Sequence, residues 1–80
     1  MEIRHFRYFL AVAQHCNFTR AAEVLGIAPP TLSRQIQDLE NALGVRLFVR
    51  KQRQVSLTEA GQALLPEADA TVRPFELAQR

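Results

Sequence analysis

Two groups of side chains in this sequence have the chemistry to bind a polyanion. The first is a polar and proline-rich stretch that carries one arginine: Pro29, Pro30, Thr31, Ser33, Arg34 and Gln37. The second is a basic cluster, in which residues 44–57 hold four cations and no acid: Arg46, Arg50, Lys51 and Arg53. Residues 59–80 have the opposite balance, with four acids against two arginines. This asymmetry indicates a basic surface that faces a polyanion, although charge alone is equally consistent with a chance cluster on a solvated surface.

The apolar residues of the stretch 29–43 predict how a helix presents the first group. Spacings of four, three and four residues separate Leu32, Ile36, Leu39 and Leu43, which predicts one buried stripe. Proline is tolerated in the first helical turn, because its missing N–H would have no partner there. At about 100° per residue, Pro30, Arg34 and Gln37 lie opposite the stripe, with Thr31 and Ser33 on its flanks.

If the polyanion is double-stranded DNA, this placement predicts a different contact for each outward residue. Arginine is the usual bidentate partner of guanine, so we expect Arg34 to contact a base edge. Pro30 is expected to fix the start of the helix and to pack against a thymine methyl group. Thr31 and Ser33 are expected to contact phosphate or bases, and Gln37 fits a DNA contact and a solvated role equally well.

The remaining segments predict three more helices and a hairpin. An apolar stripe predicts a helix from residue 3 to Cys16 or Asn17, with Thr19 capping a short helix over residues 20–25. Gly26 is expected to end that helix and Gly44 the next one, because glycine adopts positive φ without strain. Two extended pieces, 47–50 and 54–57, predict a hairpin with a basic tip. Arg50, Lys51 and Arg53 are therefore expected to contact phosphates or the minor groove, whereas Arg4, Arg20 and Arg46 are interpreted as solvated.

A last helix is expected from Glu59, with Thr58 as its cap and changes of direction at Pro66 and Pro74. It carries an apolar stripe that consists of Ala60, Leu64, Ala68, Val72 and Phe75. In a chain of 80 residues we expect the other elements to bury the whole hydrophobic core, which leaves this stripe exposed. The hypothesis is that it pairs with its copy in a homodimer.

No residues suggest an enzyme, a metal site or a bound cofactor. His5 and His15 lie about ten residues apart on one expected helix, and with Cys16 they lack a fourth ligand. Ser33 has no histidine near it in the sequence, and no glycine-rich phosphate loop or pair of clustered carboxylates is present.

Composition is that of a small globular protein, with 80 residues and 48% apolar side chains. No apolar run is long enough for a membrane span, the first residues do not form a signal peptide, and one cysteine allows no internal disulfide. We therefore expect a cytoplasmic protein without membrane contact.

The order of these elements predicts a mainly α winged helix-turn-helix, made of three helices and a small β-hairpin wing, followed by a long linker helix. The expected units are a DNA-binding domain at 1–57 and a dimerisation helix at 58–80. The chain also resembles the N-terminal DNA-binding domain of LysR-type transcriptional regulators. The blocks that carry this resemblance are RHFRYF at 4–9, FTRAAEVL at 18–25, LSRQIQDLE at 32–40, LGVRLFVR at 43–50 and LTEAG at 57–61.

The resemblance implies a bacterial regulator that binds double-stranded DNA as a dimer at an inverted repeat, with the helix at 29–43 in the major groove. It further implies that an effector-binding domain, absent from this chain, follows, and it leaves open a tetramer and contact with RNA polymerase in the full-length protein. The family usually has a polar residue where this sequence has Pro29, and often serine where it has Ala28, so these two side chains are not expected to make the family's usual base contacts in the same way. The alternative is a helical protein-interaction domain with an incidental basic wing.

Overall fold

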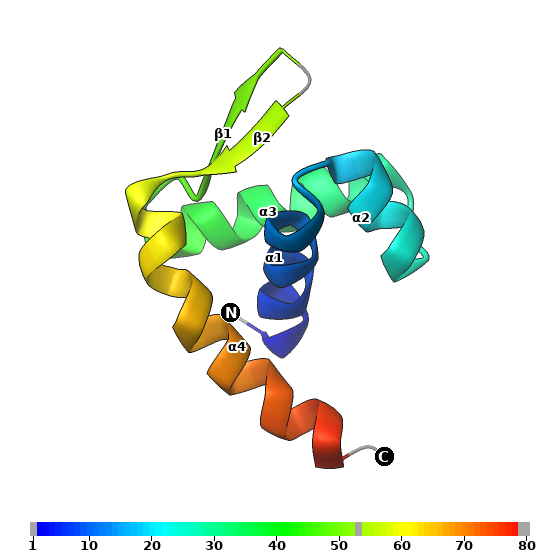
Figure 1. Cartoon of the computed structure of the whole chain (residues 1–80), viewed down its shortest axis with the longest axis vertical. Coiled ribbons are helices and arrows are strands. Elements are labelled where there is room, and N and C mark those ends of the chain that lie inside the picture. Colours follow the sequence, from blue (N-terminus) through cyan, green and yellow to red (C-terminus); the bar gives the residue numbers. More distant parts are fainter. Residues whose placement is uncertain (1, 53, 79–80) are drawn as a thin grey trace.

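The computed structural model describes residues 2–52 and 54–78, and the side chains of these residues as far as Pro74. Within this part, the order is α1 (Ile3–His15), α2 (Phe18–Leu25), α3 (Pro29–Leu43), β1 (Phe48–Lys51), β2 (Gln54–Leu57) and α4 (Glu59–Ala78) (Figure 1). The hairpin projects from one end of the helical body, and α4 leads away at the other (Figure 1). The predicted winged helix-turn-helix is confirmed. No helix among the described residues is long and apolar enough to cross a membrane.

The connection between α1 and α2 differs from the prediction by two residues. Cys16 adopts the left-handed conformation that ends α1, with φ of 53°, and its N–H donates to the carbonyl of Val12. Asn17 is thereby left in the extended conformation that an N-cap requires, and its Oδ1 accepts the N–H of Arg20 at 2.9 Å. The prediction that Thr19 caps this helix is wrong, because Asn17 caps first and places Thr19 inside it.

Both glycine turns occur where the sequence predicted them. Gly26 ends α2 with φ of 74°, and Gly44 ends α3 with φ of 73°. Ala28 precedes α3 in an extended conformation, and the two prolines that follow it occupy the first helical positions. The turn after Gly26 therefore fixes the residue at which α3 begins. It thereby sets the direction in which each side chain of that helix points around the helix axis.

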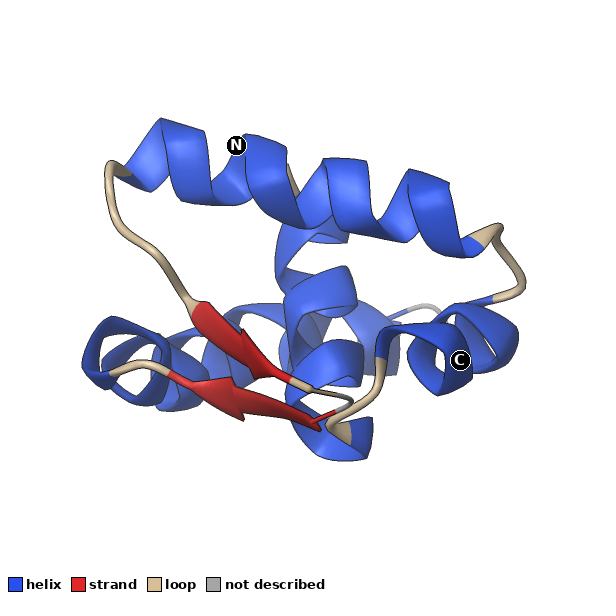
Figure 2. Cartoon of the chain, turned by 90° about the horizontal axis from the view of Figure 1, so that it is seen from above, coloured by secondary structure: helices blue, strands red, loops and turns tan. Residues whose placement is uncertain are grey.

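The core forms where α1, α2 and α3 meet the base of the hairpin. Its fully or almost fully buried side chains are Phe9, Val12, Ala21, Ala22, Leu32, Ile36, Leu39, Leu47, Phe48 and Ala68. The predicted stripe of α3 is confirmed, with Leu43 half-buried beside it. Seen from above, α3 runs the length of the domain between its loops to α2 and β1 (Figure 2).

The apolar stripe of α4 is covered by the domain itself. Ala68 and Val72 are each 1% exposed, and Ala60 and Leu64 pack against the core at partial burial. The expectation that this stripe has no core to cover is wrong, because α4 lies along α1 (Figure 1). The side chain of Phe75 lies outside the described residues. The helix continues through Pro66 and Pro74, and the change of direction at each stays a prediction.

Gly61 allows α4 to pack against the strand junction. Thr58 lies just before α4, where its N–H donates to the carbonyl of Leu47 and its hydroxyl accepts the N–H of Gly61. A Cβ at position 61 would overlap the carbonyl oxygen of Leu47 and approach Leu57 Cδ2 to 2.8 Å. The absence of a side chain at Gly61 therefore sets how closely the last helix approaches the hairpin.

We predict that Gly61→Ala lowers the free energy of unfolding by about 1–3 kcal/mol, because backbone atoms must move to admit the methyl group. Urea denaturation followed by circular dichroism measures this change. Gln62→Ala is the control, since Gln62 is exposed on the next position of the same helix and a change within about 0.5 kcal/mol is expected there. Equal stability of Gly61→Ala and the wild type would show that the contact is not tight.

Candidate nucleic-acid interface

The outer face of α3 carries most of the first predicted group. Pro29, Pro30, Thr31, Arg34 and Gln37 are all exposed, which agrees with the outward placement that the periodicity predicted for Pro30, Arg34 and Gln37. The side chain of Arg34 makes no hydrogen bond or ion pair with the part of the chain that is described. Its guanidinium group is thus available to a partner at the first turns of the helix.

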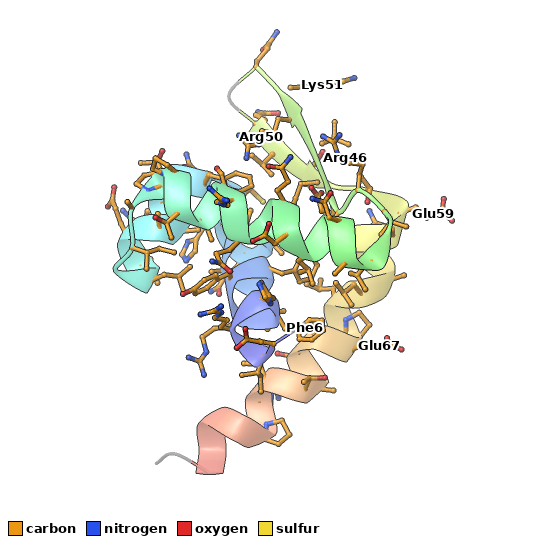
Figure 3. The ribbon with its side chains drawn as sticks, turned by 180° about the vertical axis from the view of Figure 1, so that it is seen from behind. Phe6, Arg46, Arg50, Lys51, Glu59 and Glu67 are labelled. Atoms are coloured by element: carbon orange, nitrogen blue, oxygen red, sulfur yellow. The ribbon has the colours of Figure 1, made fainter. Side chains whose placement is uncertain are left out.

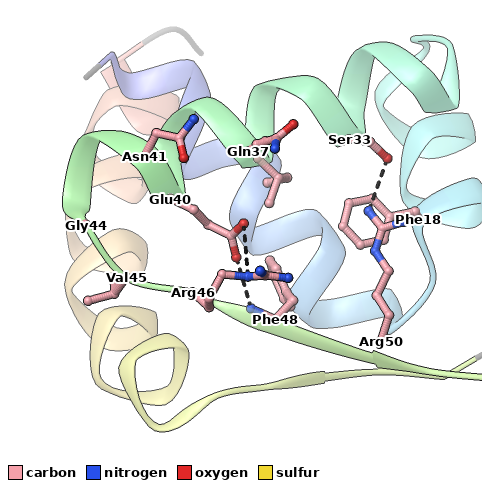
Figure 4. Close-up of a pocket in the computed structure, with 11 residues that line it drawn as sticks. Phe18, Ser33, Gln37, Glu40, Asn41, Gly44, Val45, Arg46, Phe48 and Arg50 are labelled. Atoms are coloured by element: carbon pink, nitrogen blue, oxygen red, sulfur yellow. Dashed lines mark hydrogen bonds and ion pairs between the residues drawn. The ribbon is translucent and has the colours of Figure 1, made fainter.

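Ser33 differs from this set, because it contacts the hairpin. The Nη2 of Arg50, on β1, donates a hydrogen bond to Ser33 Oγ at 3.2 Å (Figure 4). The same guanidinium lies over the ring of Phe18, with its carbon 3.9 Å from the ring centroid. Two residues predicted separately, one on the helix and one on the hairpin, therefore contact each other.

Glu40 holds the start of β1 to α3. Its carboxylate Oε2 accepts the backbone N–H of Leu47 at 2.6 Å and that of Phe48 at 3.4 Å, and its side chain is only 14% exposed (Figure 4). Arg46 lies at the outer side of this carboxylate, with its Nε 4.0 Å from Oε1 and its side chain 83% exposed. The hairpin is thus joined to the end of α3 through hydrogen bonds to a charged acceptor, which are stronger than those to a neutral one.

Phe48 fixes the same junction from the core side. Its ring contacts Phe9 at 5.4 Å between centroids and Phe18 at 6.0 Å, the second pair edge to face. Phe48 is 5% exposed, whereas the three residues that follow it on β1 are exposed. One buried aromatic residue therefore anchors a strand whose outer part is free to contact a partner.

An open groove of about 760 Å³ separates α3 from the hairpin (Figure 4). Polar side chains of α3 line one wall, including Gln37 and Asn41, and Arg46 and Arg50 line the other. Arg46 was interpreted as solvated, and the structure places its charge beside this groove. This arrangement suits a nucleic acid, because the cationic side chains of one wall can contact its phosphate backbone while the polar side chains of α3 contact its base edges.

The tip of the hairpin carries the rest of the basic cluster. Lys51 pairs with Gln54 in the antiparallel register and is exposed, projecting away from the helices (Figure 3). Gln52 makes the turn with φ of 56°. Arg53, the third predicted basic contact, lies outside the described residues.

Phe18 and Glu40 are the two residues that sequence reasoning missed. In the sequence, Phe18 is noted only as the first residue of the block FTRAAEVL, and Glu40 only as the last residue of the block LSRQIQDLE. Neither type of residue binds a polyanion itself, so a search for cations and polar groups passes over both. Their roles depend on contacts with residues at least seven positions away along the chain, which helical periodicity does not indicate.

The histidines and the cysteine occupy ordinary structural positions. His5 Nδ1 accepts the N–H of Glu2 at 3.1 Å and so caps α1. Cys16 is exposed and lies in the turn that follows α1. Among residues 2–52 and 54–78, no group of three or more His, Cys, Asp or Glu side chains could hold a metal ion.

Comparison with known sequences gives a consistent set of relatives. Residues 3–62 match the family described as bacterial regulatory helix-turn-helix proteins of the lysR family. The Hca operon transcriptional activator HcaR of Escherichia coli K12 is 56% identical over 79 residues, which cover 99% of this chain and 27% of that protein. The transcriptional regulator CatR of Pseudomonas putida is 60% identical over 62 residues, or 78% of this chain and 21% of that one. The chain therefore spans about a quarter of the length of these curated relatives.

Solved structures share the fold over nearly all of the chain. The BenM DNA-binding domain in complex with a benA site has a TM-score of 0.90 and 44% identity, covering 98% of this chain and 88% of that one. The CbnR DNA-binding domain in complex with DNA has a TM-score of 0.86 and 45% identity, covering 100% of this chain and 88% of that one. Full-length BenM matches with a TM-score of 0.87 and 45% identity, over 95% of this chain and 25% of that protein.

The role of Glu40 gives a prediction for stability. Glu40→Ala removes the acceptor of two backbone N–H groups at buried residues, so we expect a loss of about 1–3 kcal/mol in the free energy of unfolding. Glu40→Gln keeps an oxygen acceptor and is expected to fall between the wild type and Glu40→Ala. Urea denaturation measures all three proteins.

Asp38→Ala is the matched control, because Asp38 is an exposed acid on the same helix and its removal changes the net charge equally. It is expected to change stability by less than about 0.5 kcal/mol. A loss at Asp38→Ala as large as at Glu40→Ala would contradict the proposed anchor.

Proposed function

The chain belongs to the LysR family of bacterial regulatory helix-turn-helix proteins, and we propose that it is the double-stranded DNA-binding module of a transcription regulator. In this proposal α3 enters the major groove, where Arg34 contacts a base edge. Pro29, Pro30, Thr31 and Gln37 lie against neighbouring bases or phosphates. The wing follows the adjacent backbone with Lys51 and Arg53.

The observation that carries this proposal is Arg34 on the exposed first turns of α3, whose side chain has no partner among the described residues. An arginine there has both the reach and the donor geometry to read guanine, and it has no competing acceptor in the described chain. The groove between α3 and the hairpin supports the proposal, because Arg46 and Arg50 line it together with Ser33 and Gln37 of the same helix. The DNA complexes of the BenM and CbnR domains, which share this fold, support it further.

We also propose that two copies pair through α4 to bind an inverted repeat. The buried stripe is occupied by α1, so the face available to a copy is the opposite one, where Ala63, Pro66, Glu67 and Ala70 are exposed. Figure 3 shows Glu67 on that side of the helix, directed away from α1. Small side chains let two helices approach closely, and a two-fold axis would present two α3 helices to successive turns of DNA.

The chain spans about a quarter of the length of its relatives. We therefore propose the properties that the resemblance implies beyond DNA binding for a longer protein that contains this chain. These are a following effector-binding domain, assembly beyond the dimer, contact with RNA polymerase, and action in the cytoplasm where DNA is present. Neither catalysis nor a cofactor is proposed for this chain.

Arg34→Ala is predicted to lower the ratio of affinities for the cognate and a random duplex, because one arginine–guanine pair contributes about 1–3 kcal/mol of discrimination. Lys51→Ala and Arg53→Ala are predicted to weaken both duplexes equally and to flatten the salt dependence, by about 0.9 in the log–log slope for each phosphate that is no longer neutralised. Competition titrations at several salt concentrations, on a site selected from random DNA, measure both quantities. The roles are reversed if Arg34→Ala preserves the ratio while Lys51→Ala abolishes it.

The absence of any salt-dependent duplex binding by the wild-type chain would instead favour the protein-interaction domain.

The dimer gives a prediction that does not involve DNA. The double variant Ala63→Glu with Ala70→Glu places like charges on the outward face of α4, so we expect it to shift sedimentation toward the monomer while the melting temperature of the fold is retained. Ala42→Glu is the control, since Ala42 is an exposed alanine on α3. Leu64→Asp is unsuitable, because Leu64 packs against the core of its own chain. Unchanged self-association of the double variant would contradict pairing through this face.

A further inference from the structure

The side chain of Arg50 connects three elements, and this gives it a role different from that of its neighbour Lys51. We propose that Arg50 is a specificity-determining positioning residue, which holds the hydroxyl of Ser33 as a directed hydrogen-bond donor toward DNA. This inference rests on the proposed function and concerns how the same surface reads sequence.

The geometry restrains the guanidinium of Arg50 in two directions. Its face lies on the ring of Phe18, at 3.9 Å from the centroid, and its edge donates from Nη2 to Ser33 Oγ at 3.2 Å (Figure 4). Phe18 is itself held by Phe48, whose ring meets it edge to face at 6.0 Å. The planar group is therefore fixed by stacking on α2 and by a hydrogen bond to α3, although it originates from β1.

The direction of this hydrogen bond decides what Ser33 can do. An arginine side chain only donates, whereas a serine hydroxyl has one hydrogen to donate and two lone pairs that accept. Ser33 Oγ accepts a hydrogen from Arg50, which cannot accept one in return. The hydroxyl hydrogen of Ser33 is therefore donated to an acceptor other than Arg50. A phosphate oxygen, N7 of a purine, O6 of guanine or O4 of thymine meets this requirement, whereas an amino group of adenine or cytosine does not.

The hydroxyl of Ser33 also has a competing local acceptor, whether or not Arg50 is present. A serine inside a helix can donate to the carbonyl four residues earlier, here that of Pro29, and then no longer donates to an external partner. Arg50 favours the outward orientation by occupying one lone pair from the wing side. A lysine at position 50 would keep the charge but would lack the planar face and the fixed fork of donors.

The contrast with Lys51 provides the control. Lys51 is the next residue on β1, is exposed, and its side chain has no hydrogen bond or ion pair with the described residues. It is suited to a phosphate contact that carries no sequence information. Exchanging lysine and arginine at these two adjacent positions keeps the net charge and so isolates the geometry.

The experiment is a double-mutant cycle on specificity. The ratio of affinities for the selected cognate duplex and a random duplex is measured for wild type, Arg50→Lys, Ser33→Ala and the double variant. Each single change is expected to lower the ratio about 3- to 10-fold per subunit, as for one hydrogen bond, with no further decrease in the double variant. The salt slope is expected to stay at the wild-type value in Arg50→Lys, because the charge is retained. Lys51→Arg is expected to change the affinities for the two duplexes by the same factor, so that their ratio stays at the wild-type value, because a phosphate contact carries no sequence information.

The possible results distinguish the positioning role of Arg50 from DNA binding itself. The positioning role would be overturned if the decreases in the affinity ratio from the two single changes multiplied in the double variant. It would also be overturned if Arg50→Lys weakened binding to both duplexes equally. Neither result would contradict DNA binding. The absence of salt-dependent binding of either duplex by the wild type would overturn the proposed function itself. Thermal denaturation of all variants accompanies the titrations, and both side chains are accessible enough for the substitutions to leave the fold intact.

Discussion

The position of the hairpin relative to α3 depends on the carboxylate of Glu40. A two-stranded hairpin is marginal by itself, so its orientation has to come from contacts with the helical body. Glu40 supplies the acceptor for two N–H groups where β1 begins, and Phe48 buries its ring at the same point. Gly44 and Gly61 allow the chain to turn and to pack closely on either side of this junction. Displacement of this junction would move every contact of the wing.

The surface that results is preorganised for a ligand with a charged backbone. The part of α3 from Ser33 onward forms one wall of a groove, and the segment that carries Arg46 and Arg50 forms the other. Arg50 links the two walls through its hydrogen bond to Ser33. Binding then requires little ordering of the protein, which reduces the entropic cost of association. Under the role proposed for Arg50, a wing residue also influences which bases α3 prefers, so that affinity and specificity are not assigned to separate elements.

The sequence predicted those features that depend on local periodicity. The stripe of Leu32, Ile36 and Leu39, the glycine turns and the outward face with Arg34 all follow from helix geometry and backbone sterics. Prediction failed where two local solutions competed, as at Asn17 and Thr19, since both residues cap helices well and only the left-handed turn at Cys16 decides between them. It failed again for the stripe of α4, because amphipathic periodicity reveals an apolar face without identifying what covers it. Periodicity likewise could not indicate the pairing of Ser33 with Arg50, which lie 17 positions apart.

The most direct test of this DNA-binding surface is nuclear magnetic resonance of the isotopically labelled chain, titrated with the selected duplex at physiological salt. If α3 and the wing form one DNA-binding surface, the largest changes in amide shifts occur together in residues 29–37 and 48–52, and the face of α1 against α4 is little affected. Changes confined to α1 and α4, or to the hairpin without the first turns of α3, would contradict it.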